Sequence, residues 1–252
     1  MKPLITFCLL TYSFYSFGLE TKILVRAKAK DAKFIGSSIG GAHVKIIDEL
    51  TGELLASGIT SGSTGNTTLI MKTPLERGKP VTDENTAGFL ATLDIDEPVY
   101  VKVEVTAPVN QRQSLIQSST QLWVIPGKDL VGEGIIVEIP GFVIDVLAPR
   151  AHERIALTSL ENGELLIHSN IVMTCGCPIT SGGTWDADQM EVVALVKING
   201  EDLKQIKMRV TETSLFEGSF TPTEVGNYEV TVYAINSTTN NTGVDKVNFI
   251  LN

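Results

Sequence analysis

Short segments of alternating apolar and polar residues, bounded by turn residues, recur along most of this chain. No segment keeps an apolar period of 3.6 residues beyond about two helical turns, so helix is a minor component. β-branched residues dominate the segments, and clusters of Gly, Pro, Asn and Asp separate them, which is typical of an all-β fold. We expect strands over residues 21–30, 42–48, 53–58, 67–72, 99–105, 122–125, 134–139, 142–147, 163–174, 190–198, 204–210 and 215–221, followed by two more near the C-terminus.

The first 18 residues are predicted to be a signal peptide that is removed on export. Lys2 precedes an uncharged apolar run over residues 4–17, and Ser16 and Gly18 place small residues at the −3 and −1 positions of a cleavage site. The run is shorter than the roughly 20 residues that a membrane-spanning helix needs. Because no second long apolar run occurs, we expect the mature chain to have no membrane span and to be periplasmic or secreted.

The charge and the cysteine content exclude two further classes of protein, those that bind nucleic acid and those held together by a framework of disulfides. The formal charge of the full chain is −9, and it carries no basic cluster, which argues against nucleic acid as a partner. Cleavage of the signal peptide would remove one of the three cysteines and leave Cys175 and Cys177. A single pair is too few for a disulfide-stabilised framework, so stability must come from packed cores.

Residues 41–60 read G-A-H-V-K-I-I-D-E-L-T-G-E-L-L-A-S-G-I-T. This pattern resembles the opening of a carboxypeptidase-regulatory-like domain, which is a transthyretin-like β-sandwich: a strand ending in Asp, a Thr-Gly hairpin and a strand of small residues. The resemblance implies a transthyretin-like domain over residues 19–148. Members of that family are accessory modules, so it implies no catalytic residue.

The segment Ala148-Pro149-Arg150 is the best candidate for a linker, and a second domain is expected over residues 149–252. The step Gly226-Asn227-Tyr228 before an alternating strand resembles the next-to-last strand of bacterial immunoglobulin-like domains. In such folds a Tyr hydroxyl at this place holds a loop. Asn199-Gly200 predicts a tight hairpin, because both positions tolerate positive φ. The expected fold is therefore two tandem β-sandwiches, transthyretin-like and then immunoglobulin-like, after the signal peptide.

Residues 167–185 hold the densest group of reactive side chains, with a His, a Met and two Cys before a Pro and a Gly-Gly turn. In an extended strand Met173, Cys175 and Cys177 share one face, and His168 falls on the other. The two sulfurs are compatible with reduced core thiols, with a disulfide across Gly176, or with a soft metal such as copper. In the copper hypothesis the ligands are Met173, Cys175 and Cys177, with His168 as a further candidate.

A second candidate site follows in the sequence W-D-A-D-Q-M-E. Asp186, Asp188 and Glu191 bring carboxylate oxygens close together in sequence, as in calcium sites. A solvated turn before a strand also explains them, and it is the favoured interpretation because the glycine and ligand spacing of an EF-hand is absent.

No motif of a known catalytic type occurs, and the three His residues are scattered along the sequence. We therefore expect a non-catalytic binding or accessory protein that recognises a protein or glycan partner through loops of its sandwiches. The alternative is a periplasmic copper-binding or thiol-redox protein that uses the Met-x-Cys-x-Cys cluster.

Overall fold

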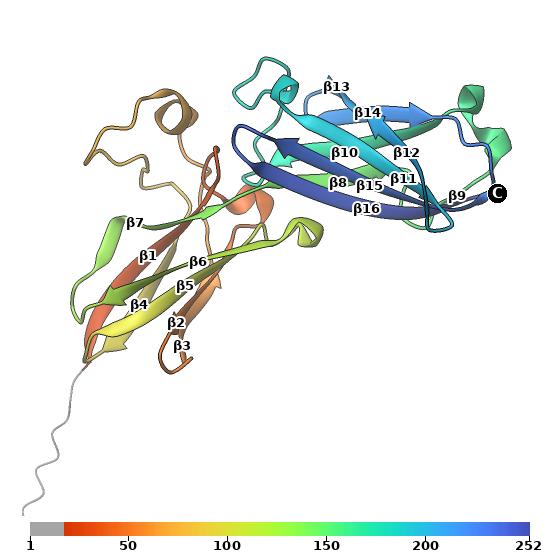
Figure 1. Ribbon diagram of the computed structural model, residues 1–252. Helices are drawn as coiled ribbons and strands as arrows, with labels where there is room; N and C mark the ends of the chain where they lie inside the picture. Colours follow the sequence, from red (N-terminus) through yellow and green to blue (C-terminus); the bar gives the residue numbers. More distant parts are fainter. Residues whose placement is uncertain (1–17) are drawn as a thin grey trace, which may run out of the picture.

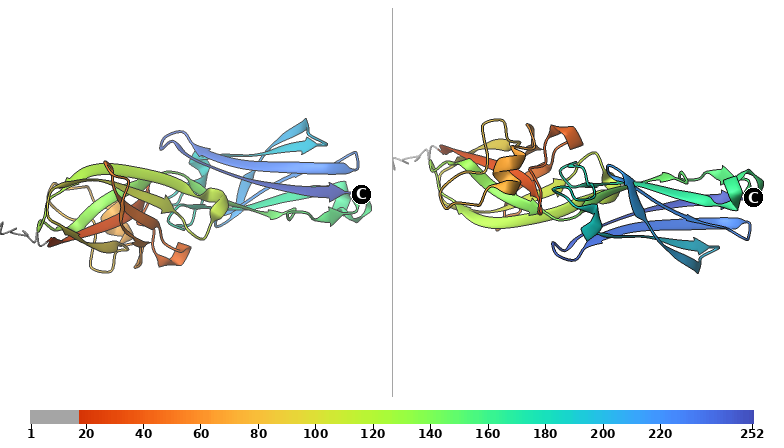
Figure 2. Two further views of the ribbon diagram at one scale, coloured as in Figure 1. Left: turned by 90° about the horizontal axis from the view of Figure 1, so that it is seen from below. Right: turned by 90° about the horizontal axis from the view of Figure 1, so that it is seen from above.

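The computed structural model describes residues 18–252, and strands dominate it. Figure 1 shows two lobes, each built from two β-sheets, with the C-terminus at the far end of the second lobe. The views from above and below show the same two lobes end to end (Figure 2). The all-β, two-sandwich fold is therefore confirmed, whereas the predicted signal peptide lies outside the described residues except for Gly18. None of the helices in the described part of the chain is long and apolar enough to cross a membrane.

The first sandwich contains seven strands. Its sheets have the orders β4-β1-β7 and β3-β2-β5-β6, and β1 pairs with β7 in parallel. The strands are β1 (Leu19–Ala29), β2 (His43–Asp48), β3 (Leu54–Ile59), β4 (Phe89–Ile95), β5 (Val99–Ala107), β6 (Ile116–Val124) and β7 (Leu130–Ile139). Three short helical segments interrupt the loops: η1 (Ser37–Ile39), η2 (Thr68–Lys72) and η3 (Arg112–Ser114).

The second sandwich contains the remaining nine strands. Its sheets have the orders β13-β14-β10-β8 and β12-β11-β15-β16-β9. The strands are β8 (Phe142–Ala148), β9 (Arg154–Ile155), β10 (Leu165–Met173), β11 (Glu191–Ile198), β12 (Glu201–Lys207), β13 (Arg209–Glu212), β14 (Leu215–Phe220), β15 (Gly226–Asn236) and β16 (Asn241–Leu251). The helical turns are η4 (Leu157–Ser159), η5 (Glu161–Gly163) and η6 (Ala187–Gln189).

Several details differ from the sequence-based expectations. The segment expected as a strand over residues 67–72 instead contains the helical segment η2 (Thr68–Lys72), and the Asn66 side chain accepts a hydrogen bond from the Leu69 backbone N–H at 3.1 Å. β4 was not predicted, although its alternation buries Ala91 and Leu93. β8 pairs with β10 and so belongs to the second sandwich. In strand pairing the chain therefore changes sandwich at residues 140–141, before the linker expected at Pro149.

The core of each sandwich comes from the inward positions of these strands. Along β5 every second residue is buried, from Val101 through Val105 to Ala107, as the alternating sequence predicts. The buried apolar side chains of both sandwiches form one contiguous cluster. The two lobes therefore meet through packed side chains as well as through the connecting chain.

A long segment between β3 and β4 folds back on the first sandwich. Arg26 of β1, only 5% exposed, donates from its guanidinium to the carbonyls of Thr86, Ala87 (3.0 Å) and Glu133 (3.2 Å). Burial lowers the pKa of Arg26, and the nearby carboxylates of Asp83 and Glu133 oppose that shift. A charged side chain in the middle strand of a sheet thus holds the end of this loop in place.

Candidate functional site

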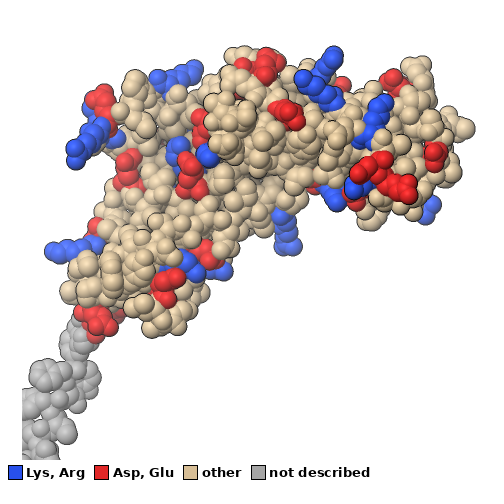
Figure 3. Space-filling model, viewed as in Figure 1, with Lys and Arg blue, Asp and Glu red and all other residues tan. Residues whose placement is uncertain are grey.

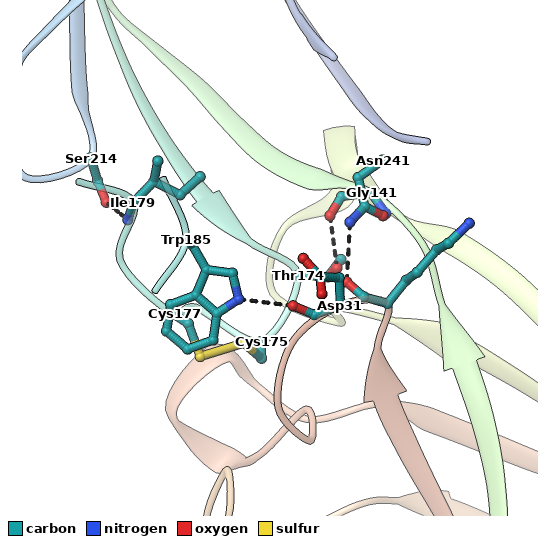
Figure 4. The surroundings of a disulfide bond; sticks show 10 residues. Asp31, Gly141, Thr174, Cys175, Cys177, Ile179, Trp185, Ser214 and Asn241 are labelled. Atoms are coloured by element: carbon teal, nitrogen blue, oxygen red, sulfur yellow. Dashed lines mark hydrogen bonds between the residues drawn. A yellow bond between two sulfur atoms is a disulfide. The ribbon is translucent and has the colours of Figure 1, made fainter. Parts of the chain in front are cut away.

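The candidate site is the turn that follows β10, where the chain leaves the core of the second sandwich. The Gly176 N–H donates to the Met173 carbonyl at 2.7 Å, and the Met173 N–H donates to the Cys177 carbonyl at 3.1 Å. These two bonds close a tight turn and bring the sulfurs of Cys175 and Cys177 to disulfide distance, as Figure 4 shows. Both cysteines are buried, at 1% and 4% exposure.

The backbone conformation at the tip of this turn favours glycine at position 176. Its φ of 77° lies in the left-handed region, which favours glycine. A Cβ at this position would lie 3.4 Å from the Ile39 side chain in the first sandwich, which is an ordinary van der Waals distance. The turn therefore packs directly against the neighbouring sandwich.

The alternation of β10 separates the candidate copper ligands. Ile167, Ile171 and Met173 are buried on one face, as predicted, while His168 lies on the other face. The His168 Nε2 atom is 3.6 Å from a carboxylate oxygen of Glu217 and has no hydrogen-bond partner in the described part of the chain. The structure thus brings Met173 and the cysteines to one side of the strand and does not bring His168 to them. A disulfide offers no thiolate, so copper binding at the sulfurs would require the reduced form.

The candidate calcium ligands Asp186, Asp188 and Glu191 each have a separate partner within the chain. Asp186 accepts hydrogen bonds from the backbone N–H groups of Asp188 (3.0 Å) and Gly182 (2.8 Å), which lower the pKa of its carboxyl group. A serine hydroxyl of the same loop donates to Asp188 at 3.0 Å, and the Tyr233 hydroxyl donates to Glu191 at 2.9 Å. Within residues 18–252, no three His, Cys, Asp or Glu side chains are grouped so as to hold a metal ion.

The loop that carries these carboxylates also reaches the first sandwich. The Trp185 indole N–H donates to the backbone carbonyl of Asp31 at 2.9 Å (Figure 4). Asp31 lies in the turn after β1 and has a positive φ of 54°. Burial raises the pKa of its carboxyl group. Trp185 thus links a loop of the second sandwich to a turn of the first.

A buried asparagine joins the turn after β1 to residues 140–141, which connect the two sandwiches. Asn241, which is fully buried at the start of β16, accepts a hydrogen bond from the Gly141 N–H at 2.8 Å. Its amide nitrogen donates to the Lys30 carbonyl at 3.1 Å. The Thr174 hydroxyl donates to the Gly141 carbonyl at 3.0 Å, so both polar backbone groups of this glycine are satisfied by side chains of the second sandwich (Figure 4).

A second set of contacts joins η3 of the first sandwich to β8. Gln113 donates from its amide to a carboxylate oxygen of Asp145 and, at 3.4 Å, to the Ile144 carbonyl. The Ile144 N–H donates to the Ser114 hydroxyl at 3.4 Å. Burial raises the pKa of Asp145, and the negative charge of Asp245 adds to that shift. We call the two sets of contacts around residues 140–141 the junction.

Two cavities flank the junction. The larger, of about 480 Å³, lies beside η3 and is lined mainly by apolar groups that include Leu115, Ile116, Ile235 and Val244. The smaller, of about 280 Å³, lies beside Trp185 and is lined mainly by polar groups. Neither gathers the side chains of a recognisable catalytic site, and the junction's polar groups are directed at one another.

Sequence reasoning identified the cysteines and the carboxylates but missed the residues that join the sandwiches. Gly141, Asn241 and Gln113 lie far apart in the sequence and belong to no motif. Trp185 directly precedes the candidate ligand Asp186, and the sequence does not indicate its contact with Asp31. The fold alone brings these residues together.

Comparison with known proteins gives no family for this chain. No family model matches it, and no curated protein matches it. Among solved structures, an engineered protein shares 14% identity at a TM-score of 0.33, over 46% of this chain and 21% of its own length. The fibronectin(III)-like modules of Clostridium thermocellum CbhA share 13% identity at a TM-score of 0.29, over 92% of this chain and 94% of theirs.

The tandem immunoglobulin domains of titin share 10% identity at a TM-score of 0.26, over 94% of this chain and 98% of theirs. These similarities are too low to support an argument about activity or ligand. The assignment of this chain to the class of two-sandwich all-β proteins rests on its strand pairing.

Proposed function

We propose that this chain is an exported, non-catalytic binding or accessory protein that presents the loops and faces of two β-sandwiches to a protein or glycan partner. The junction supports this function best. Thr174, Trp185 and Asn241, which lie near the cysteine pair in the fold, make hydrogen bonds to the connecting segment or to the first sandwich, while the two sulfurs lie at disulfide distance from each other. A fixed relation between two modules lets both contribute to one binding surface, because neither must be ordered when the partner binds.

The first sandwich is proposed to be transthyretin-like and the second immunoglobulin-like. The Thr51-Gly52 hairpin between β2 and β3, with Gly52 at a positive φ of 78°, supports the first assignment. The second is supported by the Tyr228 hydroxyl, which donates to the Glu224 carbonyl at 2.8 Å and so holds the preceding loop.

Export and binding are tested together in the native cells. The full chain is recovered from the cell fractions, its N-terminus is sequenced, and its partners are identified after chemical cross-linking in intact cells. We expect a mature chain that begins at Leu19, outside the cytoplasm, with a saturable partner. An unprocessed cytoplasmic chain would overturn the export, and the absence of any saturable partner would overturn the binding function.

The copper alternative is decided on the same material. The native protein is analysed for metal beside a variant in which Cys175→Ser and Cys177→Ser are combined. Stoichiometric copper in the native protein and none in the folded variant would replace our proposal with a copper-binding function. Metal-free protein in both cases supports a structural role for the cysteine pair.

A further inference from the structure

The outer face of the sheet β3-β2-β5-β6 carries an exposed tryptophan. Trp123 on β6 is 57% exposed, and within residues 18–252 it is the one aromatic among the large exposed hydrophobic side chains. It lies opposite Tyr100 on β5, with the ring centroids 5.2 Å apart and the planes tilted by 43°. This cross-strand pair holds the indole in place while leaving much of its surface open.

Polar side chains continue the face away from Trp123. The outward positions of β6 are Gln117, Ser119 and Gln121, all exposed, and the register places Gln121 opposite Lys102 of β5. The side chains of Gln117 and Gln121 make no hydrogen bond within the described part of the chain. Each amide offers two donor hydrogens and an acceptor oxygen to a ligand.

The charges on this face neutralise one another. Lys45 lies 3.7 Å from Glu104, and Lys102 lies 3.9 Å from both Glu104 and Glu49. These two lysines and two glutamates leave the face without net charge, although the whole chain carries −9. Acidic and basic side chains are likewise interspersed on the side of the molecule shown in Figure 3. A face of this kind complements an uncharged polar ligand better than an ionic one.

We infer that this face binds a neutral polysaccharide, with a sugar ring stacked on Trp123. The C–H groups on one side of a pyranose ring form an apolar surface that fits the face of an indole. Its hydroxyl groups both donate and accept hydrogen bonds, which matches the amides of Gln121 and Gln117 and the ion-paired groups between the strands. β6 contains nine residues and is therefore about 30 Å long, enough for several sugar units in a row.

A protein partner fits this face less well. Stable protein interfaces bury about 800 Å² on each partner around an apolar core. On β5 and β6 a single aromatic pair is followed by rows of amides, hydroxyls and paired charges, and the exposed aliphatic side chains Leu54 and Ile59 lie apart on the opposite edge strand β3. The inference rests on the proposed binding function and names the class of its partner.

The test uses the chain from residue 19 to 252 and native electrophoresis in gels that contain soluble β-1,3-glucan, mannan, xylan or dextran, with alginate as the acidic comparison. We expect at least one neutral polysaccharide to retard the protein. Trp123→Ala should weaken that binding by at least about tenfold, and Gln121→Ala should weaken it by a smaller factor. Leu90→Ala is the matched control, because Leu90 is 55% exposed but lies on β4 of the opposite sheet.

Tryptophan fluorescence gives an independent readout, because the chain has only two tryptophans. The emission should shift on addition of the polysaccharide, and Trp123→Phe should abolish the shift while circular dichroism stays unchanged. No retardation by any neutral polysaccharide, or undiminished binding by Trp123→Ala, overturns the inference. If a protein or alginate binds instead, the assignment to a neutral polysaccharide fails and the proposed function stands; with no partner of any class, both fail.

Discussion

The junction makes a quantitative prediction for the substitution Asn241→Ala. The side chain makes two hydrogen bonds, to the Gly141 N–H at 2.8 Å and to the Lys30 carbonyl at 3.1 Å. Each contributes about 0.5–1.5 kcal/mol net, and the substitution also leaves the buried N–H of Gly141 without a partner. We therefore expect the free energy of unfolding to fall by about 2–4 kcal/mol.

Urea unfolding, followed by circular dichroism, measures this loss. With a slope of roughly 2–3 kcal/mol per molar urea, the midpoint should fall by about 1 M. Asn241→Asp separates the two bonds: its carboxylate still accepts from Gly141 but cannot donate to Lys30. It should lose the contact between the sandwiches, and small-angle X-ray scattering should then show a wider spread of lobe orientations at low urea.

Asn248→Ala is the control, since Asn248 lies on the same strand, is exposed, and makes no side-chain hydrogen bond within the described part of the chain. Its effect should stay within about 0.5 kcal/mol. If Asn241→Ala costs no more than Asn248→Ala, then the buried amide does not hold the junction and the reasoning is refuted.

Three further predictions follow from the contacts above. The combined variant Cys175→Ser and Cys177→Ser should lose only about 1–2 kcal/mol of stability, because so short a ring restricts the unfolded chain little; a loss above about 4 kcal/mol in urea titrations would contradict this. Asp145→Asn should stabilise the protein at pH 7. Because the pKa of Asp145 is raised in the folded protein, this carboxyl group contributes to folding stability below its ordinary pKa of 3.8 and loses that contribution as the pH rises through the raised pKa. The same dependence of unfolding free energy on pH in both proteins between pH 3 and 7 would refute this prediction. Arg26→Met should free the loop that Arg26 holds and speed limited proteolysis within residues 73–85, while Lys22→Met, an exposed position on the same strand, should leave the cleavage rate unchanged.

Features encoded by neighbouring residues could be predicted from the sequence. Alternation identified the inward positions of β5, and Asn199-Gly200 forms the expected hairpin with φ values of 50° and 90°. Strand parity also placed Met173 in the core and His168 opposite it. In each case the feature depends on side-chain direction along a strand or on turn geometry, and both are determined within a few residues.

Features that depend on pairing between distant segments could not be predicted. β8 reads as a strand in the sequence, but only its pairing with β10 shows which sandwich it joins. β6 was expected only over its apolar end, because the polar run Q-S-S-T-Q hides a strand whose other face is covered by the first sandwich. For the same reason the sequence does not distinguish Trp123, because its exposure and its contact with Tyr100 depend on the pairing of β6 with β5.

The cysteine turn shows how this limit affects the interpretation of a candidate site. In the sequence, two cysteines, a methionine and nearby carboxylates suggest a ligand-binding cluster, since those residue types are metal ligands. In the fold, Gly176 packs on Ile39 and Trp185 reaches Asp31, so the same segment lies between two modules. Packing at such a boundary also favours buried small sulfur side chains and a glycine turn. A group of reactive residues beside a domain boundary therefore supports a structural role as strongly as a chemical one.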